Sequence, residues 1–153
     1  MEYEIKTRYI FYNDNKEIFV LYDQCDSFSK VYLPGRFHNF IGTEKFSDVL
    51  NSIIIKDNLI NIYEEKYVYY RYRSINCKLV NIPVNVTKTF YSCYVEDKST
   101  FDKLYKFFEK YGLVGDMLSF DDVVDAPINN GCIENNAVKA IKMLSKKLNY
   151  ELF

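Results

Sequence analysis

Residues 2–12 read EYEIKTRYIFY, residues 13–16 read NDNK, and residues 17–23 read EIFVLYD. Polar and apolar side chains alternate along the first segment, and successive side chains of a β-strand lie on opposite faces. The third segment is rich in β-branched and aromatic residues, which favour strands, and Asn and Asp are typical of turns. Together the three segments predict an N-terminal β-hairpin.

The first predicted strand has one charged face and one apolar face. Alternation places Glu2, Glu4, Lys6 and Arg8 together, and it places Tyr3, Ile5, Tyr9 and Phe11 on the opposite side. An antiparallel sheet commonly packs one face on the core and leaves the other in water. We therefore expect the charged face to be the solvated side of a half-buried strand.

Further strands are predicted up to residue 96. KVYL at 30–33 indicates a third strand, SIIIK and LINIY around a turn at 57–58 indicate a second hairpin, and YVYYRYR at 67–73 is strongly β-prone. We expect Pro83 to interrupt any strand over 77–82 and to confine pairing there to a sheet edge, because proline lacks an N–H donor. TKTFYSCYVE at 87–96 restores a strand pattern. Thr43 can cap a short helix over 44–51.

The last third of the chain is predicted to be mainly helical. Ser99 can cap a helix over 100–111, whose apolar residues fall at helical spacing and which ends at Gly112. A second long helix is predicted over 136–148, and one short helix before Pro127. Strands followed by helices favour an α+β fold, in which a mostly antiparallel sheet over residues 2–96 packs with the C-terminal helices.

Length and composition indicate one soluble domain. We predict a single globular domain over residues 1–153, and 48% hydrophobic residues suffice for a core without a cofactor. The 20 basic and 21 acidic residues lack the positive excess of most nucleic-acid-binding proteins, so a nucleic-acid partner is disfavoured. No apolar run is long enough to span a membrane. We expect a cytoplasmic protein without a membrane partner.

Cysteine and histidine do not predict a catalytic or metal site. Cys25, Cys77, Cys93 and Cys132 are widely and irregularly spaced, whereas structural zinc sites use closely spaced pairs. We expect all four to be reduced packing residues. His38, the single histidine, lies in the predicted loop PGRFHNF. It is expected to be a polar surface residue, with an anion-binding or interface role left open.

Two surfaces are candidates for binding a partner. Residues 116–134 contain no Lys or Arg, and acidic residues on a neutral domain can steer a basic partner. One face of YVYYRYR carries Tyr and Arg, which are enriched at protein interfaces. The predicted contact residues are Asp116, Asp121, Asp122 and Asp125 in the acidic segment, and Tyr67, Tyr69, Arg71 and Arg73 in the strand.

The opening MEYEIK resembles the E-x-E-x-K signature of the CYTH, or triphosphate tunnel, group. The resemblance implies an antiparallel sheet closed into a tunnel, with Glu2 and Glu4 holding a divalent metal and Lys6 contacting triphosphate. Arg71 and Arg73 resemble the later basic strand pair of the group. The late alternating Glu pair of the group has only Glu134 as a counterpart.

The sequence favours a non-catalytic protein-binding function. We predict a small inhibitor, a toxin-neutralising immunity protein or a host-modulating protein that covers the functional surface of a partner protein, one with a basic surface. A homodimer through an exposed strand edge stays open. The alternative is a metal-dependent domain that binds or hydrolyses triphosphate, with Glu2 and Glu4 as metal ligands and Lys6, Arg71 and Arg73 as phosphate ligands.

Overall fold

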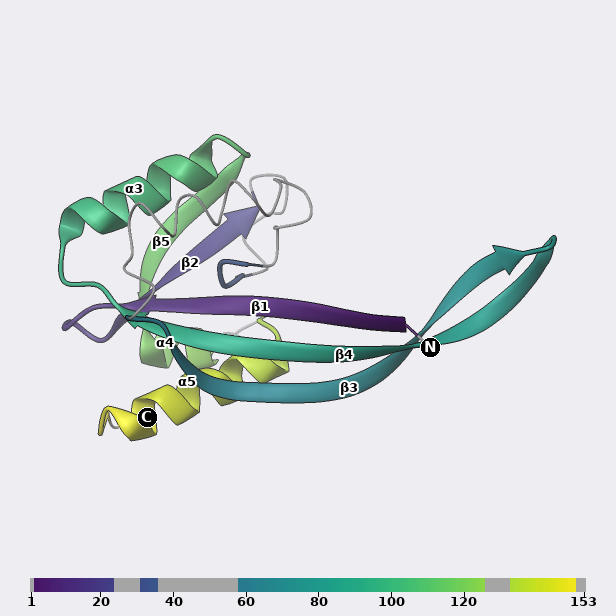
Figure 1. Ribbon diagram of the computed structural model, residues 1–153. Helices are drawn as coiled ribbons and strands as arrows, with labels where there is room; N and C mark the ends of the chain where they lie inside the picture. The colour runs from purple at the N-terminus through teal and green to yellow at the C-terminus, as the bar shows by residue number, and fades with distance from the viewer. Residues whose placement is uncertain (1, 24–30, 36–57, 126–132, 151–153) are drawn as a thin grey trace.

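The computed structural model describes residues 2–23, 31–35, 58–125 and 133–150 (Figure 1). A five-stranded sheet with the strand order β3-β4-β1-β2-β5 forms its centre. Neighbouring strands are antiparallel except β1 and β4, which run parallel. Helices that follow in the sequence pack against this sheet, so the predicted α+β class with a mostly antiparallel sheet is confirmed.

The N-terminal hairpin forms as predicted. β1 spans Glu2–Tyr12 and β2 spans Glu17–Asp23. Between them, Oδ1 of Asn13 accepts hydrogen bonds from the backbone N–H groups of Asn15 at 3.0 Å and Glu17 at 3.1 Å. This local bonding by a short polar side chain is what favours Asn in turns.

Residues 31–35 connect to both strands of the hairpin. The N–H of Tyr9 in β1 donates to the carbonyl of Pro34 at 3.0 Å, and Leu21 in β2 exchanges two backbone hydrogen bonds with Tyr32. The strand expected at 30–33 is reduced, within residues 31–33, to this one bridge at Tyr32.

β3 (Ile60–Ile75) and β4 (Lys78–Tyr94) form one long antiparallel hairpin. Asn76 and Cys77 make its turn, with φ of 51° and 63°, and positive φ at both positions is typical of a tight hairpin turn. β1 begins at Glu2, opposite Val84 of β4. The hairpin therefore continues beyond β1 as an arm of residues 70–83, which extends away from the remainder of the described chain, here called the body (Figure 1).

Pro83 does not interrupt β4, so that expectation is wrong. It pairs with Tyr70 of β3 and lies where β4 passes the end of β1. Within the described residues, β4 has only β3 as a neighbour from this point to the turn. One open edge removes the need for an N–H donor there, and the predicted edge location of Pro83 is confirmed.

Three helices lie close to their predicted positions. α3 spans Lys98–Glu109, α4 spans Phe120–Asp125 and α5 spans Asn135–Lys147. The N-cap of α3 is Asp97, without a side-chain hydrogen bond, so the expected cap at Ser99 is wrong. Gly112 has a φ of 77° and follows α3, as expected of a glycine that ends a helix.

The sequence does not predict β5, which spans Leu113–Ser119 and pairs antiparallel with β2. Gly115 obscures it, because a glycine inside a strand indicates a turn or a close approach. A Cβ atom at Gly115 would lie 2.7 Å from the ring of Tyr105 and 2.8 Å from the ring of Phe19. The glycine therefore lets two aromatic rings pack directly on the strand backbone.

The body has an apolar core on each face of the sheet, with α3 on one side and α4 and α5 on the other (Figure 1). Large buried side chains of the α3 core are Phe11, Phe19, Leu104 and Phe108. Those of the opposite core are Ile10, Phe90, Phe120, Ile141 and Leu144. The expected helix over 44–51 lies outside the described residues, and so does the expected strand SIIIK at 52–56. The segment LINIY, expected to pair with that strand, is part of β3 from Ile60 onward.

Candidate functional site

The structure brings together all five residues that the E-x-E-x-K resemblance singles out. Arg71 Nη2 lies 3.3 Å from Glu4 Oε2, and its Nη1 lies 3.6 Å from Glu2 Oε2. Arg73 Nη2 lies 2.9 Å from Glu2 Oε1, and Lys6 Nζ lies 3.8 Å from Glu4 Oε1. Each cation in this group therefore already has an internal carboxylate partner.

Tyr69 belongs to the same group. Its hydroxyl donates a hydrogen bond of 2.6 Å to Oε2 of Glu4 and accepts one from Arg71. The predicted set of Tyr67, Tyr69, Arg71 and Arg73 does share one face of β3, since these residues are two apart along the strand. Two of them, Arg71 and Arg73, bind Glu2 and Glu4, so their guanidinium groups tie the arm to β1.

The charged face is not simply the solvated side of β1, so that expectation is corrected. Glu2, Glu4 and Lys6 are half-buried and Arg8 is buried, whereas Tyr3 and Ile5 on the opposite face are 78% and 80% exposed. The cause is the parallel pairing with β4, which carries β1 out of the body toward the arm. Helix α3 then covers only the part of the apolar face that holds Tyr9 and Phe11.

The charged face continues into the body as two buried cations. Arg8 is 5% exposed and Lys88, directly opposite Lys6 in the β1–β4 register, is 3% exposed. Both contact Glu134, the residue before α5: Lys88 Nζ lies 2.7 Å from Oε2, and Arg8 Nε lies 3.4 Å from the same oxygen. We call Arg8, Lys88 and Glu134 the inner triad.

Burial and charge shift the pKa values in the inner triad. Burial is the main cause that lowers the pKa of Lys88, with Glu134 opposing the shift. Burial alone would raise the pKa of Glu134, but the positive charges of Arg8 and Lys88 bring it below the ordinary value. The sequence does not identify the buried pair of Arg8 and Lys88, because a single Lys between Thr87 and Thr89 resembles an exposed strand position.

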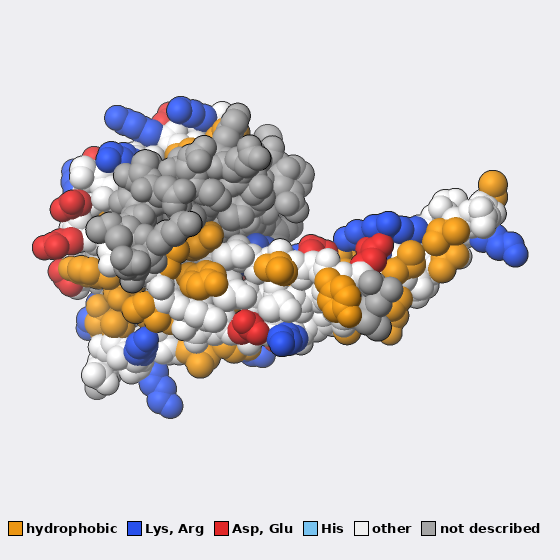
Figure 2. All heavy atoms as spheres, in the orientation of Figure 1, with side chains coloured by type: hydrophobic (Ala, Val, Ile, Leu, Met, Phe, Trp, Pro, Cys, Tyr) orange, Lys and Arg blue, Asp and Glu red, His pale blue; other side chains and the backbone are white. Residues whose placement is uncertain are grey.

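The second candidate surface is the uncharged face of the arm and of the start of β1. Strand register places the following side chains on this apolar face, each at least half exposed: Tyr3, Ile5, Val68, Tyr70, Tyr72 and Leu79. Pro83, Asn81 and Asn85 lie between them, and a shallow pocket of about 500 Å³ adjoins Val68 and Tyr3, with the exposed Lys66 at its border. Figure 2 shows hydrophobic side chains along the arm.

The apolar face differs from what the sequence predicts for YVYYRYR. Val68, Tyr70 and Tyr72 share a face, as alternation predicts. One face of that segment was expected to cover the core, but neither face of the arm does, because the arm lies beyond the body. Local periodicity does not show that the β3–β4 hairpin extends beyond the end of β1. That extension depends on the register between β1 and β4, in which Glu2 lies opposite Val84.

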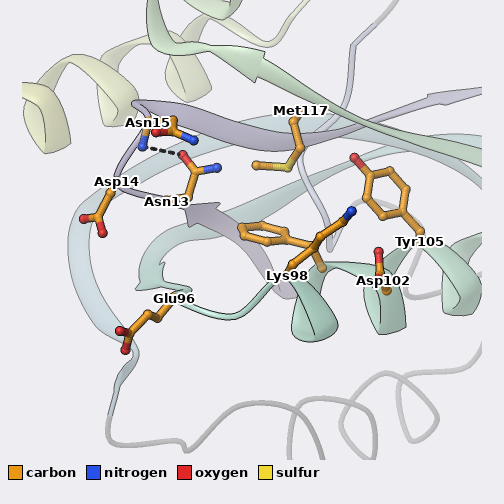
Figure 3. A pocket seen from close by; sticks show the side chains of 9 residues that line it. Asn13, Asp14, Asn15, Glu96, Lys98, Asp102, Tyr105 and Met117 are labelled. Carbon is orange, nitrogen blue, oxygen red and sulfur yellow. Dashed lines mark hydrogen bonds between the residues drawn. The ribbon is translucent and has the colours of Figure 1, made fainter.

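A pocket of about 470 Å³ lies where the β1–β2 turn meets α3 (Figure 3). Phe101, Tyr105 and Met117 supply apolar walls, while Asp14, Glu96 and Asp102 contribute carboxylates. Asp14 accepts a 2.6 Å hydrogen bond from the hydroxyl of Tyr94, which together with burial raises the pKa of Tyr94 to about 12. Among the described residues that line this pocket there is no Ser, Cys or His.

The acidic residues predicted to bind a partner lie at the opposite edge of the sheet from β3. Asp116 is exposed on β5, the other edge strand, and Asp121, Asp122 and Asp125 belong to α4. Burial, followed by the charges of Asp116 and Asp122, raises the pKa of Tyr22. Both acids therefore lie near Tyr22, and the acidic group and the Tyr–Arg face do not form one surface.

The cysteines differ in environment. Cys93 is buried, which raises the pKa of its thiol to about 11, and Cys77 is exposed at the tip of the arm. His38, Cys25 and Cys132 lie outside the described residues. Among the residues that the structure describes, no group of three or more His, Cys, Asp or Glu side chains is arranged to hold a metal ion.

Comparisons of the chain with protein-family models, with curated proteins and with solved structures find no match. In the described part of the chain, no helix combines the length and the apolar character needed to cross a membrane.

Proposed function

We propose that the protein is a non-catalytic, cytoplasmic protein-binding domain that recognises its partner through the apolar face of the arm. The observation that carries this proposal is the set of exposed side chains on one face of the sheet: Tyr3, Ile5, Val68, Tyr70, Tyr72 and Leu79. From Val68 to Leu79 this face carries no charged residue, and Lys66 borders it next to Val68. Large exposed apolar patches on soluble proteins mark interaction sites, and Tyr is enriched where interfaces derive their affinity.

The exposed area supports an interface of ordinary size. Tyr3, Tyr70 and Tyr72 are 78%, 63% and 69% exposed. Since an aromatic side chain buries ~150–250 Å², these three alone offer about 300–500 Å². With Ile5, Val68 and Leu79 the face approaches the roughly 800 Å² that one partner contributes to a standard interface.

The partner is a protein with an uncharged apolar groove or surface that receives the arm. The inhibitor, immunity or host-modulating roles all require such a contact, in which the arm covers the functional surface of another protein. The acidic residues on β5 and α4 would act at a distance, by steering a partner that is basic elsewhere on its surface. Replacing Asp121, Asp122 and Asp125 with Asn together should then slow association and weaken its salt dependence; an unchanged association rate would remove the steering role.

The apolar face is tested with two single substitutions on the same strand. Tyr72→Glu places a charge on the apolar face, and Ile75→Glu places the same charge on the opposite face, where Lys78 pairs with Ile75. Each tagged variant and the unchanged chain are used to capture proteins from the source cells, and captured proteins are quantified by mass spectrometry. A specific partner retained by Ile75→Glu and lost by Tyr72→Glu supports the proposal. Equal capture by all three refutes the apolar face as the binding surface.

The triphosphate alternative is the second candidate, favoured by the convergence of Glu2, Glu4, Lys6, Arg71 and Arg73. Two carboxylates plus phosphate oxygens are a usual ligand set for Mg²⁺ or Mn²⁺ bound with a nucleotide or polyphosphate. The test is thermal unfolding with and without Mn²⁺ and inorganic triphosphate, followed by measurement of released phosphate. A rise in melting temperature that Glu4→Ala abolishes supports binding at this face, because a ligand that binds only the folded state stabilises it. No rise at high ligand concentration eliminates this candidate.

A further inference from the structure

The inner triad holds more positive than negative charge in a buried place. Lys6, Arg8 and Lys88 lie along the β1–β4 part of the charged face. Among the described residues, the carboxylates in the same part are Glu134 and Glu65, which lies opposite Lys88 in the β3–β4 register. Lys6 is also paired with Glu4 further along the face. Buried charge is costly unless it is paired and hydrogen-bonded, so two buried cations that share the carboxylate of Glu134 need an explanation.

Glu134 satisfies Arg8 incompletely. The two closest approaches between these side chains, Nε to Oε2 and Nη2 to Oε1, are both 3.4 Å, which is long for a charge-assisted hydrogen bond. Nε of Arg8 is buried and makes no hydrogen bond, while Nη1 donates to the carbonyl of Thr7 at 3.1 Å. Lys88, in contrast, holds the carboxylate at 2.7 Å.

We infer that the inner triad is a binding site for a phosphate-class oxyanion, and that the carboxylate of Glu134 occupies this site from within the chain. A tetrahedral oxyanion offers more acceptor oxygens than one carboxylate, so it can accept hydrogen bonds from Lys88 and from the Nε–H of Arg8 at once. Lys6, opposite Lys88, would contact a second phosphate group of a longer ligand. This inference goes beyond protein binding by the arm, and it requires neither the arm nor a metal.

The position of Glu134 explains how the site could be both filled and available. The residue directly precedes α5, and its side chain is 26% exposed, so it reaches the buried cations from the surface. Displacing it moves a partly exposed charged side chain and no apolar residue of the core. Binding of an external oxyanion is then a competition with an internal carboxylate, which makes the affinity of the unchanged protein low and that of a variant without the carboxylate higher.

The experiment compares the unchanged chain with Glu134→Gln and, as a matched control, Glu2→Gln, which removes a carboxylate from the outer part of the same face. Melting temperatures are measured with orthophosphate, with inorganic triphosphate and with potassium chloride at equal ionic strength, all without divalent metal. We expect phosphate to raise the melting temperature of Glu134→Gln at least twice as much as that of the unchanged chain or of Glu2→Gln. Adding Lys88→Met to Glu134→Gln should remove the response.

Two further readouts keep the inference testable if Glu134→Gln unfolds. In NMR spectra of the unchanged chain, orthophosphate should shift the backbone amide signals of Arg8, Lys88 and Glu134 more than those of Arg71 and Arg73. Equal responses to orthophosphate and triphosphate indicate a site for one oxyanion, and tighter binding of triphosphate indicates a phosphate chain that reaches Lys6. The inference is overturned if neither anion shifts these signals, or if the outer arginines respond first. These metal-free measurements do not involve protein capture, so their failure leaves the apolar face untouched.

Discussion

The body and the arm are parts of the same sheet, yet their strands have different surroundings. In the body, helices cover both faces, and Phe11, Phe19 and Phe90 are fully buried. In the arm, β3 and β4 have only each other as neighbouring strands within the described chain, and Tyr70 and Tyr72 stay largely exposed. Aromatic residues in similar strand patterns therefore form the core in the body, whereas in the arm they remain exposed to solvent.

We expect the largest difference in unfolding free energy between a core substitution in the body and a surface substitution in the arm. Phe108→Ala removes a buried ring between α3 and the sheet and should lower the free energy of unfolding by about 3–5 kcal/mol. Tyr72→Ala should change it by less than ~0.5 kcal/mol, because an exposed residue away from caps and networks contributes little. Urea unfolding measures both, and a comparable loss in the two variants would mean that the arm is part of the core structure.

Gly115→Ala tests the close packing of the body. The added methyl group meets the rings of Phe19 and Tyr105 at less than 3 Å, so we expect a loss of about 1–3 kcal/mol in unfolding free energy. The matched control is Val114→Ala on the same strand, whose side chain is exposed and should cost less. If Gly115→Ala is neutral, the rings adapt and the body is less tightly packed than the structure indicates.

The inner triad predicts a pH effect located in the body. The pKa of Glu134 is lowered in the folded state, so its contribution is present above the ordinary value of 4.5 and is lost as the pH falls through the lower folded pKa. Lys88 acts in the opposite sense: its lowered pKa is a cost of burial that diminishes at alkaline pH as the amine loses its proton. The unchanged chain should therefore lose stability below pH 4.5 more steeply than Glu134→Gln, as measured by urea unfolding across pH. Parallel curves would show that Glu134 is not paired as described.

The smallest expected effect is a gain in the arm. Cys77 adopts a positive φ that costs an L-residue about 1–2 kcal/mol, whereas Asn-Gly is the favoured pair in such a turn. Cys77→Gly should slow hydrogen exchange of arm amides between residues 70 and 83, while amides of β2 and β5 keep their rates. Faster exchange in the arm would mean that the turn does not have this conformation.

The parts of the fold that depend on local patterns could be predicted from the sequence. β1, β2, α3 and α5 have clear periodicity and punctuation, such as the Asn13 turn and Gly112. β5 could not be predicted, because Gly115 serves a contact between elements that are distant in the sequence. The parallel pairing of β1 with β4 was also hidden, since side-chain alternation does not reveal which strand lies beside which.

In the candidate sites, too, local patterns predict which residues of one strand share a face, but they do not predict which strands lie side by side. Alternation correctly grouped Glu2, Glu4 and Lys6, and it grouped Arg71 with Arg73, but only the β1–β4–β3 register joins the two groups. The inner triad needs a further contact, because Glu134 is separated from Lys88 by 46 residues. Exposure of the apolar face depends on where β1 ends, which is a property of the whole sheet.

The most direct test of the separation between arm and body is a variant with a shortened arm. Residues 72–81 are replaced by Asn-Gly, which joins the paired residues Arg71 and Ile82 by a tight turn and removes Tyr72 and Leu79. Thermal unfolding and quantitative partner capture are then measured on the same preparation. We predict a melting temperature within about 4 °C of the unchanged chain and loss of the captured partner. A shortened variant that unfolds would contradict the separation of the body from the arm, and one that keeps its partner would contradict recognition by the arm.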